Sequence, residues 1–200
     1  MKYMDVMYEE IKSVFVGKLR SLMNDYKRSS HPMKNKKIQT APFPITMYAI
    51  SVLDLFSSYE AGWNEPNKKL SRNQTTRMVN YLVEYMGYDK IPTRALVQMH
   101  RHQLMHTSEP RMIQNKKTRD VFAWEISDSR PNHMTLRKTT FNNPKINDIQ
   151  ELRFNIKDFI KDLESASKKY LSKVKNNQEL IERYTACKEE IKKKIVDFDA

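Results

Sequence analysis

Apolar side chains recur at three- and four-residue steps along most of this chain, and this spacing constrains its fold more than any other feature. Such a spacing places the apolar side chains on one face of a helix, where they can form a core. The second predicted helix is apolar on most sides and should therefore occupy a central position in a bundle. The first four predicted helices cover residues 3–26, residues 44–62, residues 71–86 and residues 92–106.

The second half of the chain mixes two kinds of pattern. Residues 121–126 and 134–137 look like short strands, and the turn-forming residues between them predict a β-hairpin. Helical spacing resumes at Ile146, and Asn176 with Glu179 resembles a capping box that opens a last helix. We therefore expect one domain over residues 1–200, mainly α, in which a small β-hairpin precedes two long C-terminal helices.

The chain is strongly basic. Lys and Arg number 36 against 24 Asp and Glu, which gives a formal charge of +12. Residues 1–110 and residues 111–200 each carry half of this surplus, so any cationic surface must be assembled by the fold. The charge favours an anionic partner, with nucleic acid ahead of acidic protein or membrane.

A predicted loop over residues 27–37 concentrates part of this charge. Lys34, Lys36 and Lys37 are candidates for contacts with an RNA backbone. The alternative is a solvated linker, which is the commoner role of a run of lysines.

The number of cysteines and the hydropathy of the sequence indicate the cellular compartment. Cys187 is the only cysteine, which excludes an internal disulfide and a cysteine zinc site and fits a reducing environment. The first residues show no signal-peptide pattern, and no window approaches the apolar length that a membrane span needs. We expect a cytoplasmic protein that does not contact a membrane.

One short stretch carries the residues best suited to chemistry. Three of the five histidines lie within residues 99–106, together with Arg101. His102 and His106 are four residues apart and would project from one side of a helix. An imidazole can transfer a proton near neutral pH, and a guanidinium can bind a phosphate through two hydrogen bonds. These groups suit phosphodiester cleavage without a metal or other cofactor, and two copies facing each other in a homodimer would complete the site.

The stretch Arg101-His102-Gln103-Leu104-Met105-His106 resembles the signature of the HEPN superfamily, the higher eukaryotes and prokaryotes nucleotide-binding domain. The resemblance would cover about residues 45–175, with residues 1–26 and 176–200 as helices packed on that core. It implies a helical bundle, a homodimer formed through the motif helices and metal-independent endoribonuclease activity. A toxin or a phage-defence effector, restrained by an antitoxin or another regulatory protein, is one implied setting.

The resemblance also implies roles for individual residues. Arg101 would stabilise the phosphate, His106 would be the catalytic histidine, and His102 would be the polar residue that assists it. Some members have an auxiliary acidic residue on an earlier helix, for which Asp54 and Glu60 are candidates. A carboxylate on a largely buried helix needs a partner such as an arginine, and an ordinary half-exposed acid is the competing interpretation of Asp54.

Other interpretations of the same stretch stay open. The chain could be a non-catalytic helical module that binds RNA or protein through its basic surface. His102 and His106 could share a zinc ion, although the sequence offers neither the glutamate of a His-Glu-x-x-His motif nor an evident third ligand. The histidines could also have no chemical role and simply pack against neighbours or contact solvent.

Overall fold

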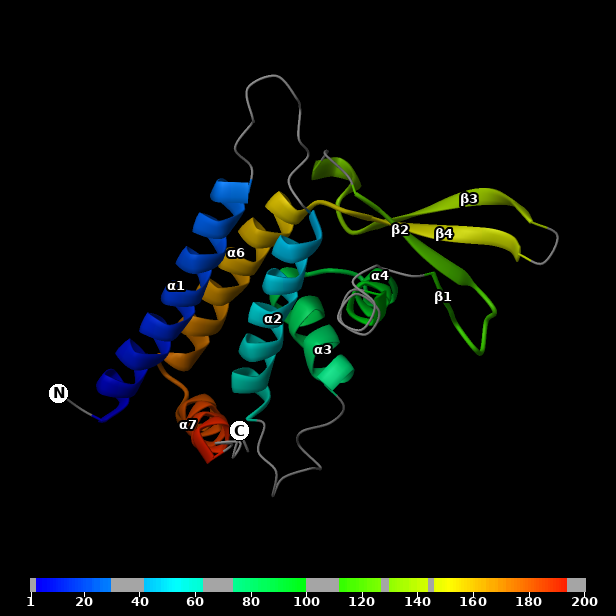
Figure 1. Cartoon of the computed structure of the whole chain (residues 1–200). Helices are drawn as coiled ribbons and strands as arrows, with labels where there is room; N and C mark the ends of the chain where they lie inside the picture. The colour runs from blue at the N-terminus through cyan, green and yellow to red at the C-terminus, as the bar shows by residue number, and fades with distance from the viewer. Residues whose placement is uncertain are drawn as a thin grey trace, which may run out of the picture.

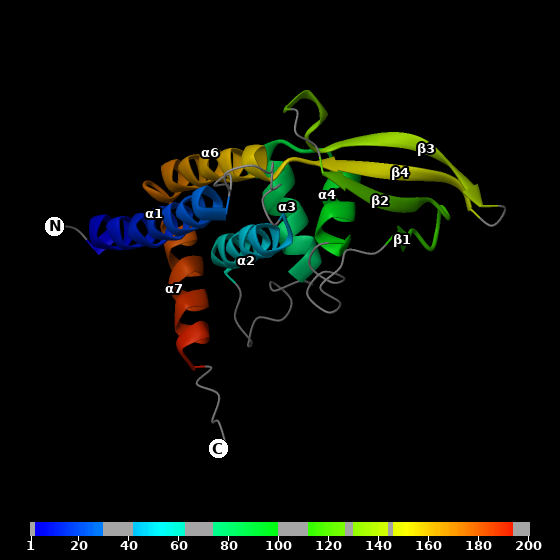
Figure 2. The same ribbon diagram turned by 45° about the horizontal axis from the view of Figure 1, so that its top comes forward.

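The computed structural model describes residues 3–29, 42–62, 74–99, 112–126, 130–143 and 146–193. Over these residues the chain is mainly helical, with a small four-stranded sheet that extends from one side of the helices (Figures 1 and 2). The α-helices are α1 (Tyr3–Ser29), α2 (Pro42–Ala61), α3 (Gln74–Met86), α4 (Lys90–Leu96), α6 (Ile156–Val174) and α7 (Gln178–Lys193).

The predicted helices at the start of the chain are confirmed. α1 buries one stripe that includes Met7, Ile11 and Phe15, and α2 contacts α1, α3, α6 and α7, so it is central as its apolar sequence predicts. The Phe15 ring stacks on Phe56 of α2 at a centroid distance of 3.9 Å and on Tyr170 of α6 at 5.0 Å. Burying a side chain of this size contributes about 1.5–3 kcal/mol to the free energy of folding. This aromatic stack therefore holds three helices together.

α3 ends at a glycine, as predicted. Gly87 has a φ of +73°, and its N–H donates to the Val83 carbonyl while the Tyr88 N–H donates to the Leu82 carbonyl. The first of these bonds, with Gly87 in left-handed geometry, is that of an αL cap, and both bonds satisfy carbonyls at the end of the helix. α4 then begins at Lys90, two residues before the predicted start, and the backbone widens to π-helical geometry over residues 97–99.

The sheet corrects the predicted β-hairpin. Its strands are β1 (Ile113–Gln114), β2 (Val121–Ile126), β3 (Thr135–Asn143) and β4 (Ile146–Phe154), in the order β1-β2-β4-β3. Both predicted strands exist, but they do not pair with each other because β4 lies between them, parallel to β2 and antiparallel to β3. The turn-forming residues between β2 and β3 lead into a short 3-10 helix, η2 (Arg130–Asn132), and not into a hairpin.

β4 also corrects the helix predicted from Ile146. Ile149 and Leu152 are both buried although they lie on opposite faces of the strand. A strand buried on both faces does not alternate apolar and polar residues, so its three-residue spacing imitates a helix. The helix α6 begins only at Ile156, after Asn155, whose side chain accepts the Asp158 N–H at 3.1 Å and caps the helix.

α6 and α7 are the two expected C-terminal helices. The side chain that caps α7 belongs to Asn177 and not to Asn176, because the Asn177 side-chain oxygen accepts the Leu180 N–H at 3.2 Å. Glu179 instead forms an ion pair with Arg183 at 2.6 Å. Cys187 is fully buried in the apolar stripe of α7, in agreement with its predicted place in the core.

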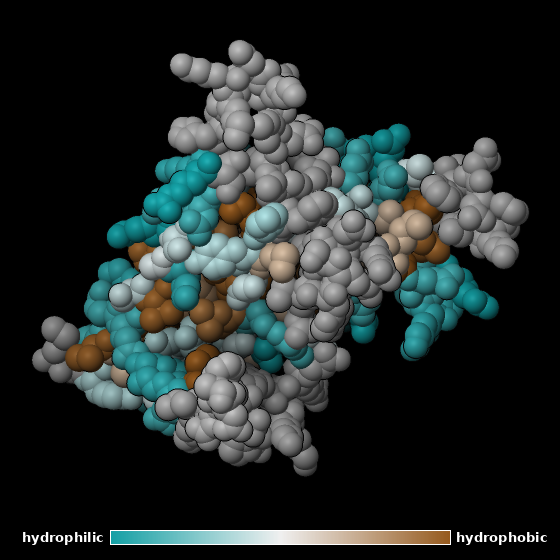
Figure 3. Space-filling view, viewed as in Figure 1, coloured by the Kyte–Doolittle hydropathy of each residue, from teal (hydrophilic) through white to brown (hydrophobic). Residues whose placement is uncertain are grey.

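The visible surface of the molecule is mixed. Brown apolar patches lie among teal polar side chains over the helical part of the chain in Figure 3. Within the ranges that the structure describes, none of the helices combines the length and the apolar composition that crossing a membrane requires.

Candidate nucleic-acid interface

A cavity of about 560 Å³ lies between α4 and the β1–β2 strands. Lys90 and Arg94 contribute to it from one side of α4, because a four-residue step returns each side chain to nearly the same face of the helix, and Gln98 contributes from the π-helical turn that follows. Phe122 of β2, which is buried, and Ala95 of α4 supply apolar lining.

The turn between β1 and β2 supplies the opposite wall. The Asn115 side chain accepts the N–H groups of Lys117, at 3.0 Å, and of Thr118, at 3.4 Å. The Arg119 N–H donates to the Asn115 carbonyl at 2.8 Å, with Arg119 at a φ of +64°. These bonds fix the turn from within, as Asx turns do, so Lys116 and Lys117 are presented to the cavity by an ordered backbone.

The charged side chains in the described lining of this cavity are all positive. Lys90, Arg94, Lys116 and Lys117 all line it, and the described residues of its lining include no carboxylate. None of these four side chains forms an ion pair with a residue in the part of the chain that the structure describes. Four cations around one cavity, without ion-pair partners among the described residues, attract a polyanion, and the amides of Gln98 and Gln114 add hydrogen-bonding groups.

Arg101, His102 and His106, and the loop lysines Lys34, Lys36 and Lys37, lie outside the described residues. The sequence places Arg101 two residues after Met99, the last described residue of the α4 segment. The cationic cavity is therefore on the segment that leads directly into the Arg-His motif.

Asp54 lies between α2 and α3. Its Oδ1 accepts a hydrogen bond from Nη2 of Arg77 at 3.0 Å, and its Oδ2 accepts one from the Gln74 amide. A half-buried carboxylate on α2 thus has the arginine partner that its burial requires. A cavity of about 430 Å³ adjoins this group, and the Nε of buried Arg77 has no hydrogen-bond partner among the residues that the structure describes.

Glu60 lies on the same helix but faces different neighbours. Its Oε1 is 3.7 Å from Nη1 of Arg183 on α7, and the same guanidinium donates to the Glu60 carbonyl oxygen. Burial, followed by the nearby charge of Glu84, raises the pKa of Glu60 above its ordinary value. The structure does not bring Glu60 together with Asp54, and neither residue lines the cationic cavity.

Sequence reasoning missed the four cations of the cavity. Arg94 carried a detectable signal, since Arg94 and Gln98 follow the four-residue step of the predicted helix that leads into the motif, whereas Lys90 lies two residues before the predicted start of that helix. Lys116 and Lys117 carried none, because only the three-dimensional pairing of β1 with β2 brings their turn opposite α4.

No family model, curated protein or solved structure matches this chain. Across the described ranges, no group of three or more His, Cys, Asp or Glu side chains is arranged to hold a metal ion.

Proposed function

We propose that this chain is an RNA-binding endoribonuclease of the HEPN type, which holds RNA at the α4 cavity and cleaves it with Arg101, His102 and His106. The observation that carries the proposal is the cationic cavity on the segment that leads into the motif. Lys90, Arg94, Lys116 and Lys117 offer a polyanion four charges, which is the recognition that a sequence-tolerant RNA-binding surface needs.

The proposed chemistry needs only the groups of the motif and the RNA. One imidazole takes the proton of a ribose 2′-hydroxyl, and the 2′-oxygen then attacks the adjacent phosphorus. The bond from phosphorus to the 5′-oxygen breaks, and a second, protonated imidazole delivers its proton to that oxygen. Arg101 neutralises the charge that develops on the phosphoryl oxygens. The products are a 2′,3′-cyclic phosphate and a 5′-hydroxyl, so no oxidant, water or metal enters the balance.

The proposal includes a homodimer, in which two copies of the motif supply the two imidazoles and two guanidinium groups. It also includes a cytoplasmic location, which the single cysteine favours, and a regulatory protein such as an antitoxin, which the resemblance implies.

The test is digestion of a labelled single-stranded RNA in the presence of EDTA, paired with a binding measurement on a 2′-deoxy analogue that cannot be cleaved. We expect Arg101→Ala and His106→Ala to lower the cleavage rate by about 10²–10⁴-fold while leaving binding of the analogue nearly unchanged. We expect a Lys90→Glu, Arg94→Glu double variant to weaken binding of the analogue and to slow cleavage at low RNA concentration.

The outcomes separate the two parts of the proposal. Binding without cleavage, unaffected by His106→Ala, supports the non-catalytic binding module instead of the nuclease. Cleavage that persists in both motif variants removes the proposed catalytic residues. Binding that the double variant does not change removes the α4 cavity as the RNA site.

A further inference from the structure

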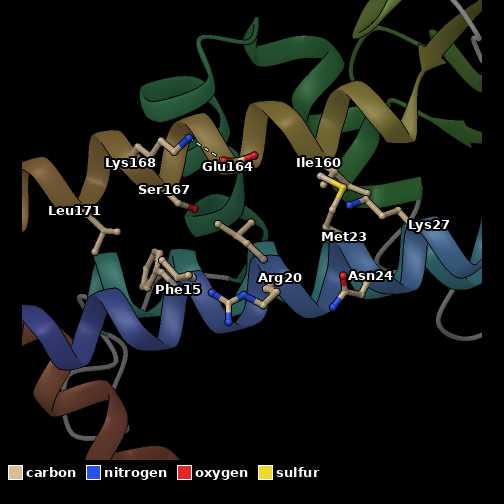
Figure 4. Close-up of a pocket in the computed structure, with 12 residues that line it drawn as sticks. Phe15, Arg20, Met23, Asn24, Lys27, Ile160, Glu164, Ser167, Lys168 and Leu171 are labelled. Atoms are coloured by element: carbon tan, nitrogen blue, oxygen red, sulfur yellow. Dashed lines mark hydrogen bonds and ion pairs between the residues drawn. The ribbon is translucent and has the colours of Figure 1, made fainter.

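A third cavity lies between α1 and α6. Its volume is about 300 Å³, and Figure 4 shows the two helices side by side with the lining side chains between them. On α1 the lining runs from Phe15 to Lys27, and on α6 it runs from Ile160 to Leu171. At 1.5 Å per residue, the lining is about 18 Å long on α1, which is more than three helical turns.

The floor of this α1–α6 groove is apolar. Phe15 and Ile160 are almost fully buried at its base, and Leu19 and Met23 are only partly covered. Val16, at its edge, keeps 41% of its surface exposed. A strip of this kind has the spacing with which a helix presents apolar side chains to another helix.

The rim of the groove carries three cations and one carboxylate, Glu164. Arg20 and Lys27 stand on α1, and neither forms an ion pair with a residue that the structure describes. Lys168 stands on the α6 wall, where it pairs with Glu164 at 2.8 Å (Figure 4). Arg20 and Lys27 are seven residues apart, so their backbones are separated by about 10.5 Å along the helix.

We propose that the α1–α6 groove binds an acidic amphipathic helix of a partner protein, in the helix-in-groove mode. The apolar face of the partner covers Leu19 and Met23, and its flanking Glu and Asp side chains meet Arg20, Lys27 and Lys168. The spacing of the cations favours this partner over an anionic amphiphile with one head group, because such a molecule carries its charge at one end only.

This inference goes beyond the proposed function and does not depend on it. The described lining of the groove shares no residue with the α4 cavity, so a chain without nuclease activity would still bind the partner helix. A helical regulator bound here would hold α1 against α6, while the cationic cavity on α4 stayed open.

The test uses the full chain and a stapled helical peptide of about four turns, with leucines at heptad positions a and d and glutamates beside them. Binding is followed by fluorescence anisotropy. We expect the acidic peptide to bind, and a peptide of the same composition in scrambled order not to bind. We expect an Arg20→Glu, Lys27→Glu double variant to weaken binding about ten-fold, because rim attraction becomes repulsion.

Lys18→Glu is the matched control, since Lys18 is an exposed lysine of α1 outside the groove. It should change the affinity by less than about two-fold. The double variant replaces exposed side chains, so its circular dichroism spectrum and unfolding midpoint should match those of the wild type.

Any of five results would overturn the inference. The acidic peptide could bind no better than the scrambled one, or the Lys18→Glu variant could weaken binding as much as the double variant. Decanoate could bind to the groove where the peptide does not. Sedimentation could show a dimer that dissociates in the double variant, which would make a second copy the occupant. An RNA oligonucleotide could displace the peptide in competition, which would assign the groove to RNA.

Discussion

The hydroxyl of Tyr88 donates a hydrogen bond to Oδ2 of Asp162 at 2.6 Å, and so connects the segment between α3 and α4 to helix α6. The same hydroxyl lies 2.9 Å from Nε2 of His133. Because the Asn155 N–H donates to Nδ1 of His133 at 3.0 Å, the proton of a neutral imidazole must be on Nε2 and must point to the Tyr88 oxygen. A directed chain of hydrogen bonds therefore runs from the Asn155 N–H, through His133 and Tyr88, to the carboxylate of Asp162 on α6.

Replacing Tyr88 with Phe should lower the free energy of unfolding by about 1–3 kcal/mol. The change removes one hydroxyl but leaves two polar groups, of buried His133 and half-buried Asp162, without that partner. Urea unfolding measures the difference, and hydrogen exchange of the Asn155 N–H should become faster.

Tyr48→Phe is the control for this prediction. Tyr48 is half-buried on α2, and its hydroxyl makes no hydrogen bond to any residue that the structure describes. An equal decrease in stability in both variants would show that the chain through His133 contributes little.

The sequence alone predicts the helices well where a single face is buried. α1 buries Met7, Ile11 and Phe15 in regular steps, and the predicted helix over residues 3–26 is confirmed. At β4 the same reasoning was wrong, because Ile149 and Leu152 are buried on opposite faces by contacts that only the assembled sheet provides. The pairing of β2 with β4 is parallel and joins distant segments, so no local turn in the sequence indicates it.

In the candidate site, too, local sequence predicts some features, and tertiary packing determines the others. Asp54 pairs with Arg77 and keeps 28% of its side chain exposed, so the structure shows both the arginine partner and the half-exposed acid that the sequence allowed, and its auxiliary role stays a prediction. The identity of that arginine does not follow, since it depends on how α2 and α3 pack. The cavity beside α4 was not predicted because Lys116 and Lys117 reach it only through the β1–β2 turn. The roles proposed for Arg101 and His106 stay predictions.

Removing one cation from the α4 cavity should change the salt dependence of RNA binding. For single-stranded nucleic acid, the slope of log K against log salt concentration falls in magnitude by about 0.7 for each phosphate that the protein no longer neutralises. Arg94→Ala should therefore give a slope smaller in magnitude by about 0.7. The measurement is a titration of an uncleavable oligonucleotide at several salt concentrations.

The exposed Lys175, at the end of α6, is the matched control for this titration. It does not line the α4 cavity, so Lys175→Ala should leave the slope unchanged. A slope unchanged in Arg94→Ala, or reduced equally in both variants, would mean that RNA does not use the cavity.

Glu60→Gln should gain stability relative to the wild type as the pH rises. Burial raises the pKa of Glu60 in the folded state above its ordinary value of 4.5, so the folded chain binds this proton more tightly than the unfolded chain. The favourable contribution of Glu60 is therefore complete below the unfolded pKa and is lost as the pH rises through the folded pKa. Glutamine has no proton to lose, and it leaves the bond from Arg183 to the backbone carbonyl of residue 60 in place.

The measurement is urea unfolding of both proteins from about pH 4 to about pH 8. Glu189→Gln, which changes an exposed carboxylate on α7, should give a difference from the wild type that varies little with pH. If Glu60→Gln instead becomes less stable relative to the wild type as the pH rises, the ion pair with Arg183 outweighs the cost of burial.

Replacing each of three glycines with alanine separates two costs of an added methyl group: strained backbone geometry and steric crowding. Gly62 has a φ of +66°, and an added Cβ would lie 2.9 Å from Cβ of Arg183. Gly87 has a φ of +73° but nothing within 4 Å of an added Cβ, and Gly17 lies inside α1 with the same open space. Gly17→Ala should raise the free energy of unfolding by about 1 kcal/mol, because alanine favours a helix.

Gly87→Ala should lower the free energy of unfolding by about 1–2 kcal/mol, which is the cost of left-handed backbone geometry for a residue with a Cβ. Gly62→Ala carries the same backbone cost and must also displace Arg183 from its interactions with Glu60. Its decrease in stability should therefore exceed that of Gly87→Ala by about 1 kcal/mol or more. Urea unfolding of the three variants checks the order, and equal decreases at Gly62 and Gly87 would mean that α7 shifts away from α2 at no cost.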